Sequence, residues 1–230
     1  MKKRIAIVSL IIFLIGLSYW SLSFTLKKES VKVANILNNY TIFIDPGHGG
    51  KDNGTCYNEI AEDEINLNIA SMIYESLIND GAYAFITRTG DYDLSDMYAT
   101  NHKIMDLNKR ISYILDNEAD LYVSIHLNAY SDCDVSGAQV FYRKDLENSK
   151  NFATIMQEKL NKINKKDKKP KTGDYYLLNN TEDITGIIVE CGFLSNPEER
   201  KQLTTIKYQK ELSEIICDGI IEYLASLNSI

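Results

Sequence analysis

Short apolar segments alternate with amphipathic ones along most of this chain. Apolar runs predict buried strands at 42–44, 82–86, 121–125, 137–142 and 184–189, and a further short strand at 175–178. Between them, apolar residues recur at spacings of three and four, which predicts helices over about 62–80, 106–115, 146–163 and 206–227. Such alternation is typical of an α/β layer fold with helices on both faces of one sheet.

The first residues differ from the rest in character. A basic start, Met1 to Arg4, precedes an apolar run from Ile5 to about Leu26. This pattern predicts an export signal, long enough to span a bilayer as a helix of about 20 residues. Because no small-x-small cleavage site stands out, we favour an uncleaved signal-anchor (1–26) over a cleaved signal peptide. Residues 27–39 would be a tether and residues 40–230 a single catalytic domain at the outer face of the cytoplasmic membrane.

Charge and cysteine content narrow the classes of partner. The net charge is −7, and no patch of Arg and Lys interleaves with aromatic residues, which argues against nucleic acid as a partner. The one basic block, Lys159 to Lys171, is typical of a solvated helix end or loop. No C-x-x-C pair indicates a structural zinc ribbon. Cys56 and Cys133 fall in predicted loops, and the sequence leaves open whether they pair.

Two of the three histidines follow predicted strands directly. Pro46 and Gly47 end the first strand just before His48, and His126 follows the strand at 121–125. Strand ends of this kind gather along one edge of an open α/β sheet. Two neutral imidazoles and one carboxylate form a typical catalytic zinc set, with a fourth position open for water. His102 lies in a polar stretch and is expected at the surface.

The sequence offers several carboxylates for the third position. Glu59, Glu62, Asp63 and Glu64 cluster at the start of a predicted helix, where acids are favoured by the helix dipole, and periodicity does not separate them. Glu190 ends a buried strand, where a charge is costly. It is expected either to pair with an arginine (Arg88 or Arg110) or to act beside the metal.

Two other polar residues flank the histidines, and their roles stay open. Asp45 and Asn128 would either orient the imidazoles or cap the backbone. The amides of Gly49 and Gly50 are candidates to hold an oxyanion.

Six short segments, taken in order, resemble one known family: the zinc-dependent N-acetylmuramoyl-L-alanine amidases of the type called amidase 3. The resemblance runs from residue 41 to the C-terminus. Its segments are Ile44-Asp45-Pro46-Gly47-His48-Gly49-Gly50, Glu62-x-x-x-Asn66-Leu67, Thr87-Arg88, Asp106-Leu107 with Arg110, Ser124-Ile125-His126-Leu127-Asn128-Ala129, and Val189-Glu190-Cys191-Gly192-Phe193-Leu194-Ser195-Asn196. The last segment, with the single domain and the apolar N-terminus, is most similar to the sporulation amidases of spore-forming Firmicutes.

The resemblance implies a site and a reaction. It makes His48, Glu62 and His126 the ligands of Zn²⁺ and Glu190 the catalytic carboxylate, on a twisted, mostly parallel three-layer α/β fold. Asn128 and Arg88 become candidate substrate-binding residues. The substrate would be peptidoglycan, cleaved between N-acetylmuramic acid and L-alanine.

In a sporulating cell the resemblance places this step before muramic-δ-lactam formation in the cortex. An accessory spore lipoprotein is then an expected partner, and the space between the forespore membranes an alternative location. Two other functions remain to be weighed. One is a membrane-tethered peptidoglycan-binding protein with a vestigial metal site, and the other is a zinc carboxypeptidase acting on the stem peptide.

Overall fold

A computed structural model describes the backbone of residues 2–228, and in the first helix the side chains from residue 11 onward except 30 and 31. Its elements, in chain order, are α1 (Lys2–Leu37), β1 (Thr41–Pro46), β2 (Cys56–Tyr57), β3 (Ile60–Ala61), α2 (Glu62–Asn79), β4 (Tyr83–Ile86), α3 (His102–Asp116), β5 (Leu121–Asn128), β6 (Gln139–Tyr142), α4 (Glu147–Leu160), β7 (Lys171–Thr172), α5 (Tyr176–Asn180), β8 (Thr185–Phe193), α6 (Pro197–Leu203) and α7 (Ile206–Leu227).

The strands form one main sheet in the order β4-β1-β5-β8-β6-β7, and β2 pairs with β3 in a small hairpin. β4, β1, β5 and β8 are mutually parallel, whereas β6 runs antiparallel to β8. The central strands are buried along nearly their whole length, as expected for a sheet covered on both faces. The predicted α/β fold with a mostly parallel sheet is therefore confirmed.

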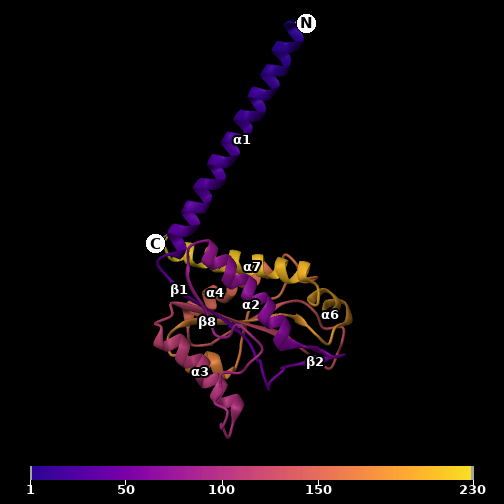
Figure 1. The fold of residues 1–230 in the computed structure, drawn as a ribbon. Coiled ribbons are helices and arrows are strands. Elements are labelled where there is room, and N and C mark those ends of the chain that lie inside the picture. Colours follow the sequence, from indigo (N-terminus) through magenta and orange to yellow (C-terminus); the bar gives the residue numbers. More distant parts are fainter. Residues whose placement is uncertain (1, 229–230) are drawn as a thin grey trace.

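Helices cover the two faces unequally (Figure 1). The larger core joins the sheet to α2, α4 and α7, with Ile69, Phe152 and Ile216 fully buried in it. The smaller core lies under α3 and α5 and includes Ile114 and Leu178. A cleft lies at the carboxyl ends of β1, β5 and β8, lined by the loops that follow these strands and by the first residues of α2 and α5.

Two local predictions were wrong. Residues 176–180 form the helix α5 instead of a strand, because Leu177 and Leu178 both turn into the smaller core. The helix predicted from residue 106 begins at His102, where the Asn101 side chain accepts a hydrogen bond from the amide of Ile104. This places Asp106 inside α3.

The N-terminal helix α1 projects away from the domain in Figure 1. The segment expected to be a tether is helical as far as Leu37, whose side chain is fully buried, and α1 contacts α7. Side chains 1–10, which include the basic start of the predicted export segment (1–26), lie outside the described residues. Within the part that is described, no helix is both long and apolar enough to cross a membrane.

Candidate active site

The three predicted metal ligands arrive from three different elements. His48 follows β1, His126 lies near the carboxyl end of β5, and Glu62 is the first residue of α2. β1 and β5 are adjacent and parallel, with Asp45 opposite Ser124, so both histidines emerge at the same edge. Their rings lie edge to face with centroids 4.9 Å apart.

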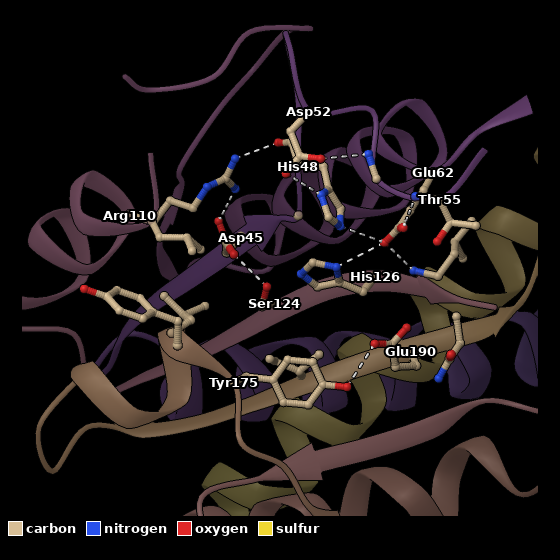
Figure 2. A pocket seen from close by; sticks show the side chains of 18 of the residues that line it. Asp45, His48, Asp52, Thr55, Glu62, Arg110, Ser124, His126, Tyr175 and Glu190 are labelled. Atoms are coloured by element: carbon tan, nitrogen blue, oxygen red, sulfur yellow. Dashed lines mark hydrogen bonds and ion pairs between the residues drawn. The ribbon is translucent and has the colours of Figure 1, made fainter. Parts of the chain in front are cut away.

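The carboxylate of Glu62 lies beside the two rings and contacts both (Figure 2). Its Oε1 is 3.3 Å from His48 Nε2 and 3.1 Å from His126 Nδ1, and one ligating atom of each residue falls within 4.8 Å of the others. The backbone amides of Leu127 and Thr55 donate to the two oxygens of this carboxylate. Of the four clustered acids, the structure thus brings Glu62 to the histidines, while Glu59 and Glu64 are exposed.

The carboxylates and imidazoles of this cluster stabilise each other's charged forms. Burial would lower the pKa of His48, but hydrogen bonds to Glu62 and Asp52 raise it to about 8. Burial likewise opposes ionisation of Glu62, yet hydrogen bonds from His126 and His48 hold the pKa of this carboxyl far below its usual range. Asp52 Oδ2 lies 3.0 Å from His48 Nδ1, and a carboxylate in this position fixes the orientation of the ring and its tautomer.

The fit around the cluster leaves no room for side chains at two glycines. A Cβ atom at Gly47 would lie 2.2 Å from Cε1 of His126. Gly54 has φ +64°, and a Cβ there would lie 2.6 Å from Oε2 of Glu62. His48 itself has φ 63°, a conformation that non-glycine residues rarely adopt. The site is therefore built by backbone as much as by side chains.

A buried ion pair supports the loop that carries His48. Asp45 accepts hydrogen bonds from Thr87, Ser124 and Arg110, the last at 2.7 Å. Arg110 also donates to the carbonyl of His48 at 2.6 Å. Of the two roles left open for Asp45, the structure shows contacts that shape the strand end, and its hydrogen bonds do not reach the imidazole.

Arg88 lies behind this loop and outside the cleft. It is 1% exposed and donates to the carbonyls of Pro46, Gly47, Asp63 and Gly90. Its guanidinium therefore holds backbone together. The two candidate oxyanion donors are also engaged, since the amide of Gly49 donates to Asp52 and that of Gly50 to Asp91.

Glu190 lies beside the cluster, near the carboxyl end of β8. The structure pairs it with neither Arg88 nor Arg110. Tyr175 donates a hydrogen bond to Oε1 at 3.3 Å, whereas the buried Oε2 has no hydrogen-bond partner among the described residues. Burial raises the pKa of Glu190, and the negative charge of Glu62 adds to this against the opposing effect of His126. An unpaired buried carboxylate of this kind is typical of a group that meets a ligand.

These side chains line one cleft of about 540 Å³ (Figure 2). His48, Glu62, His126, Glu190 and Asn128 all reach it. The Asn128 side chain accepts a hydrogen bond from the following amide, which orients it locally. His102 is outside this group and contacts Ser95 and Lys51.

The donor set fits a zinc ion. Two imidazole nitrogens and a carboxylate oxygen converge within 4.8 Å, and the ligands of catalytic zinc sites are of these types. The unpaired oxygen of Glu190 lies in the same cleft and outside this donor set. Sequence reasoning missed two residues of this arrangement. Asp52 had only its four-residue spacing from His48 as a signal, and Tyr175 lay in a segment assigned to a strand.

Comparison with known proteins agrees with this geometry. The chain is 34% identical to the germination-specific N-acetylmuramoyl-L-alanine amidase of Bacillus subtilis, over 97% of its own length and 96% of the relative's. It is also 32% identical to the N-acetylmuramoyl-L-alanine amidase LytC of that organism, of which it covers 38%. Among solved structures, the CwlD amidase from Clostridioides difficile in complex with the GerS lipoprotein matches with a TM-score of 0.78 and 34% identity, covering 82% of this chain and all of that one. Residues 42–222 match the model of the N-acetylmuramoyl-L-alanine amidases, and the chain belongs to this family.

Proposed function

We propose that this amidase uses Zn²⁺, held by His48, Glu62 and His126, to hydrolyse the amide between N-acetylmuramic acid and L-alanine in peptidoglycan. The observation that carries the proposal is the pairing of this cluster with Glu190, whose Oε2 is buried and unpartnered in the same cleft. A non-catalytic binding protein would gain nothing from such a carboxylate, because its burial costs free energy.

Glu190 is the proton carrier in this proposal. A bound zinc ion would supply Lewis acidity, which polarises the carbonyl and makes water a nucleophile near neutral pH. The carboxylate of Glu190 accepts the proton of the attacking water and delivers it to the leaving nitrogen of alanine. Burial raises the pKa of Tyr175, so its phenol keeps its proton and donates to Oε1 of Glu190. This contact leaves Oε2 free to face the substrate.

The reaction and its metal are tested together with the full chain and the variant His126→Ala. With zinc added, we expect the full chain to release peptides that begin with L-alanine from purified peptidoglycan. His126→Ala removes one of three protein ligands and is expected to lose bound zinc and activity together, with a drop of at least about 100-fold. Metal content by atomic absorption and product identification by mass spectrometry provide the readouts.

The control for this test is His102→Ala, which removes a histidine outside the cluster. It should keep zinc and activity. Equal zinc content in the wild type and His126→Ala would contradict the assigned ligands. Release of single C-terminal amino acids in place of whole peptides would replace the amidase with a carboxypeptidase.

We also place the enzyme in spore cortex maturation, outside the cytoplasmic membrane, with an accessory lipoprotein as partner. The support is the germination-specific relative and the CwlD structure, which is described as a complex with the GerS lipoprotein. Export by residues 1–26 is supported by the basic start and by the exposed apolar side chains of α1, among them Phe13, Leu17 and Trp20.

A strain that lacks the gene tests both the role in cortex maturation and the need for the export segment. Its spores are expected to lose muramic-δ-lactam and keep stem peptides on muramic acid, as measured by mass spectrometry of muropeptides. Complementation with residues 27–230 should not restore the lactam, whereas the same residues behind an unrelated cleavable signal should. Restoration by residues 27–230 alone would contradict the role of the export segment, and unchanged muropeptides in the null strain would contradict the cortex role.

A further inference from the structure

A second cleft, of about 1080 Å³, lies next to the first and shares Asn128 with it. One side is formed by residues near the ends of β5 and β8, including Asn128 and Phe193. The other side is formed by the segment that runs from the end of α4 to the first residue of β7, which contributes a series of lysines to the lining: Lys165, Lys166, Lys168, Lys169 and Lys171. We call this second cleft the lysine groove.

The lysine groove begins beside the catalytic carboxylate. Phe141, which lines it, packs against the ring of Tyr175 with centroids 5.3 Å apart. Tyr175 in turn donates to Glu190. Gln139 also lines the groove and is the direct partner of Glu190 in the pairing of β6 with β8. A chain leaving the reaction centre past Asn128 therefore enters the groove at once.

The wall that carries the lysines is fixed to the domain. Gln139 Nε2 donates to the carbonyl of Lys169 at 2.7 Å and to Oε1 of Gln157 at 2.9 Å. Asn161 accepts from the amide of Lys168 and donates to its carbonyl. The buried glutamine and the asparagine thus hold the backbone of this segment in place, whereas the sequence indicated only a solvated helix end or loop.

Two of the five lysines have structural partners, and three do not. Lys165 pairs with Glu198, and Lys168 contacts the carbonyl of Gly137 and lies over the ring of Phe193. Lys166, Lys169 and Lys171 are exposed, and no described residue forms an ion pair with their ammonium groups. Among the described residues, only two carboxylates line the groove, and one of them is the partner of Lys165. On a chain of net charge −7, this is a local excess of positive charge directed at a binding cleft.

We propose that the lysine groove binds the free carboxylates of the stem peptide during its release from muramic acid. The proposal rests on the amidase reaction above and assigns the peptide side of its substrate. The sugars joined to muramic acid carry no charge, and its lactyl carboxyl is consumed in the amide. A peptide attached through its amino end keeps the carboxylate at its other end and those of acidic residues. The anionic part of the substrate is therefore the peptide, and it belongs in the cationic groove.

The first test measures binding and needs no turnover. Wild-type full chain, Lys166→Gln/Lys169→Gln/Lys171→Gln and the matched control Lys144→Gln/Lys201→Gln/Lys207→Gln are titrated with a stem tetrapeptide and with the same peptide after amidation of its carboxylates. The control lysines are exposed and line neither of the two clefts. We expect the groove variant to bind the acidic peptide about 5- to 20-fold more weakly, since each exposed ion pair contributes only a few-fold. The amidated peptide should bind equally to all three proteins.

Three results would overturn the proposal. The first is equal affinity of the groove variant and the control for the acidic peptide, and the second is equal affinity of the wild type for the acidic and amidated peptides. The third is a loss of affinity for polyglutamate in the groove variant that equals its loss for the acidic peptide. The last would identify a surface for other polyanions, such as an acidic protein.

Turnover of muropeptides separates this proposal from the amidase assignment. The groove variant should have a higher KM for the acidic substrate and an unchanged kcat, because the lysines bind a part of the substrate that is distant from the reacting amide. A drop in kcat with unchanged KM would overturn the groove as a peptide site. Failure of the wild type to release any peptide would instead overturn the amidase reaction, and the binding results would still decide the groove.

Discussion

Replacement of Glu190 by Gln is expected to lower turnover on peptidoglycan by roughly 100- to 10,000-fold while the zinc content stays at the wild-type level. Glutamine keeps the size of the side chain and removes the basic oxygen that takes the proton from water. Because Glu190 lies outside the ligand set, the metal should remain bound. Single-turnover release of peptides and metal analysis of the same preparations are the measurements. Loss of zinc together with activity would contradict the assignment of Glu190 as proton carrier.

The matched control is Tyr175→Phe, which keeps the carboxylate and removes its hydrogen-bond donor. The hydroxyl of Tyr175 lowers the pKa of Glu190, against the larger effect of burial, which raises it. Without the hydroxyl the pKa of Glu190 rises further. Glu190 accepts a proton only when ionised, so activity is lost as the pH falls through its pKa. The acid limb of the profile of kcat/KM should therefore move to higher pH in Tyr175→Phe, and an unmoved limb would contradict this role.

Replacement of Arg110 by Leu is expected to reduce the free energy of unfolding by about 3–5 kcal/mol. Arg110 and Asp45 are each about 2% exposed, so the substitution leaves the Asp45 carboxylate buried without its cation. Asp106 loses a partner at 2.8 Å, and the carbonyl of His48 loses its donor. Zinc affinity should fall with stability, because the backbone that presents His48 is released. Denaturant unfolding and zinc titration measure the two effects.

Arg143→Leu provides the comparison. Arg143 pairs with Asp145 and Asp183, whose side chains are exposed, so its loss should cost at most about 1 kcal/mol. Equal losses in the two variants would contradict the importance of the buried pair.

The buried pair also has a pH signature. Burial opposes ionisation of Asp45, but Arg110, Ser124 and Thr87 lower its pKa from 3.8 to about 2. Its contribution to stability is thus complete above about pH 4 and lost as the pH falls through about 2.

The order of strands and helices could be predicted from the sequence because apolar periodicity dominates this chain. Runs such as 42–44 and 184–189 have no alternative to burial, and they form β1 and β8. The strand prediction at 175–178 was wrong because two adjacent leucines are compatible with either a buried strand or one face of a helix. The predicted start of α3 was wrong because Asn101 and Asp106 are both good caps. Asn101 caps the helix, and Asp106 lies one turn inside it, where its carboxylate pairs with Arg110 of the same helix.

The site was predictable in its residue types and less so in its contacts. Histidines after strand ends and an acid at the end of a buried strand are visible signals, and the resemblance to a family then selected Glu62. The partners of Asp45 and Arg88 could not be found this way, because most of them lie about 40 to 80 positions away in the sequence. The lysine groove was missed for a related reason. The buried glutamine that fixes its wall lies in a different strand, and a charged run alone gives no sign of such an anchor.

The N-terminal helix and the active site lie at opposite ends of β1. α1 ends at Leu37, just before the strand begins at Thr41, and His48 follows its other end. The strand has six residues, so the reaction centre lies about 20 Å from the point where α1 enters the domain. In Figure 1 the helix leaves on one side, and the hairpin strand β2, close to Glu62 in the chain, lies on the opposite side. A chain held at a bilayer by residues 1–26 would thus present its cleft outward, with only residues 27–37 of α1 between the bilayer and the domain.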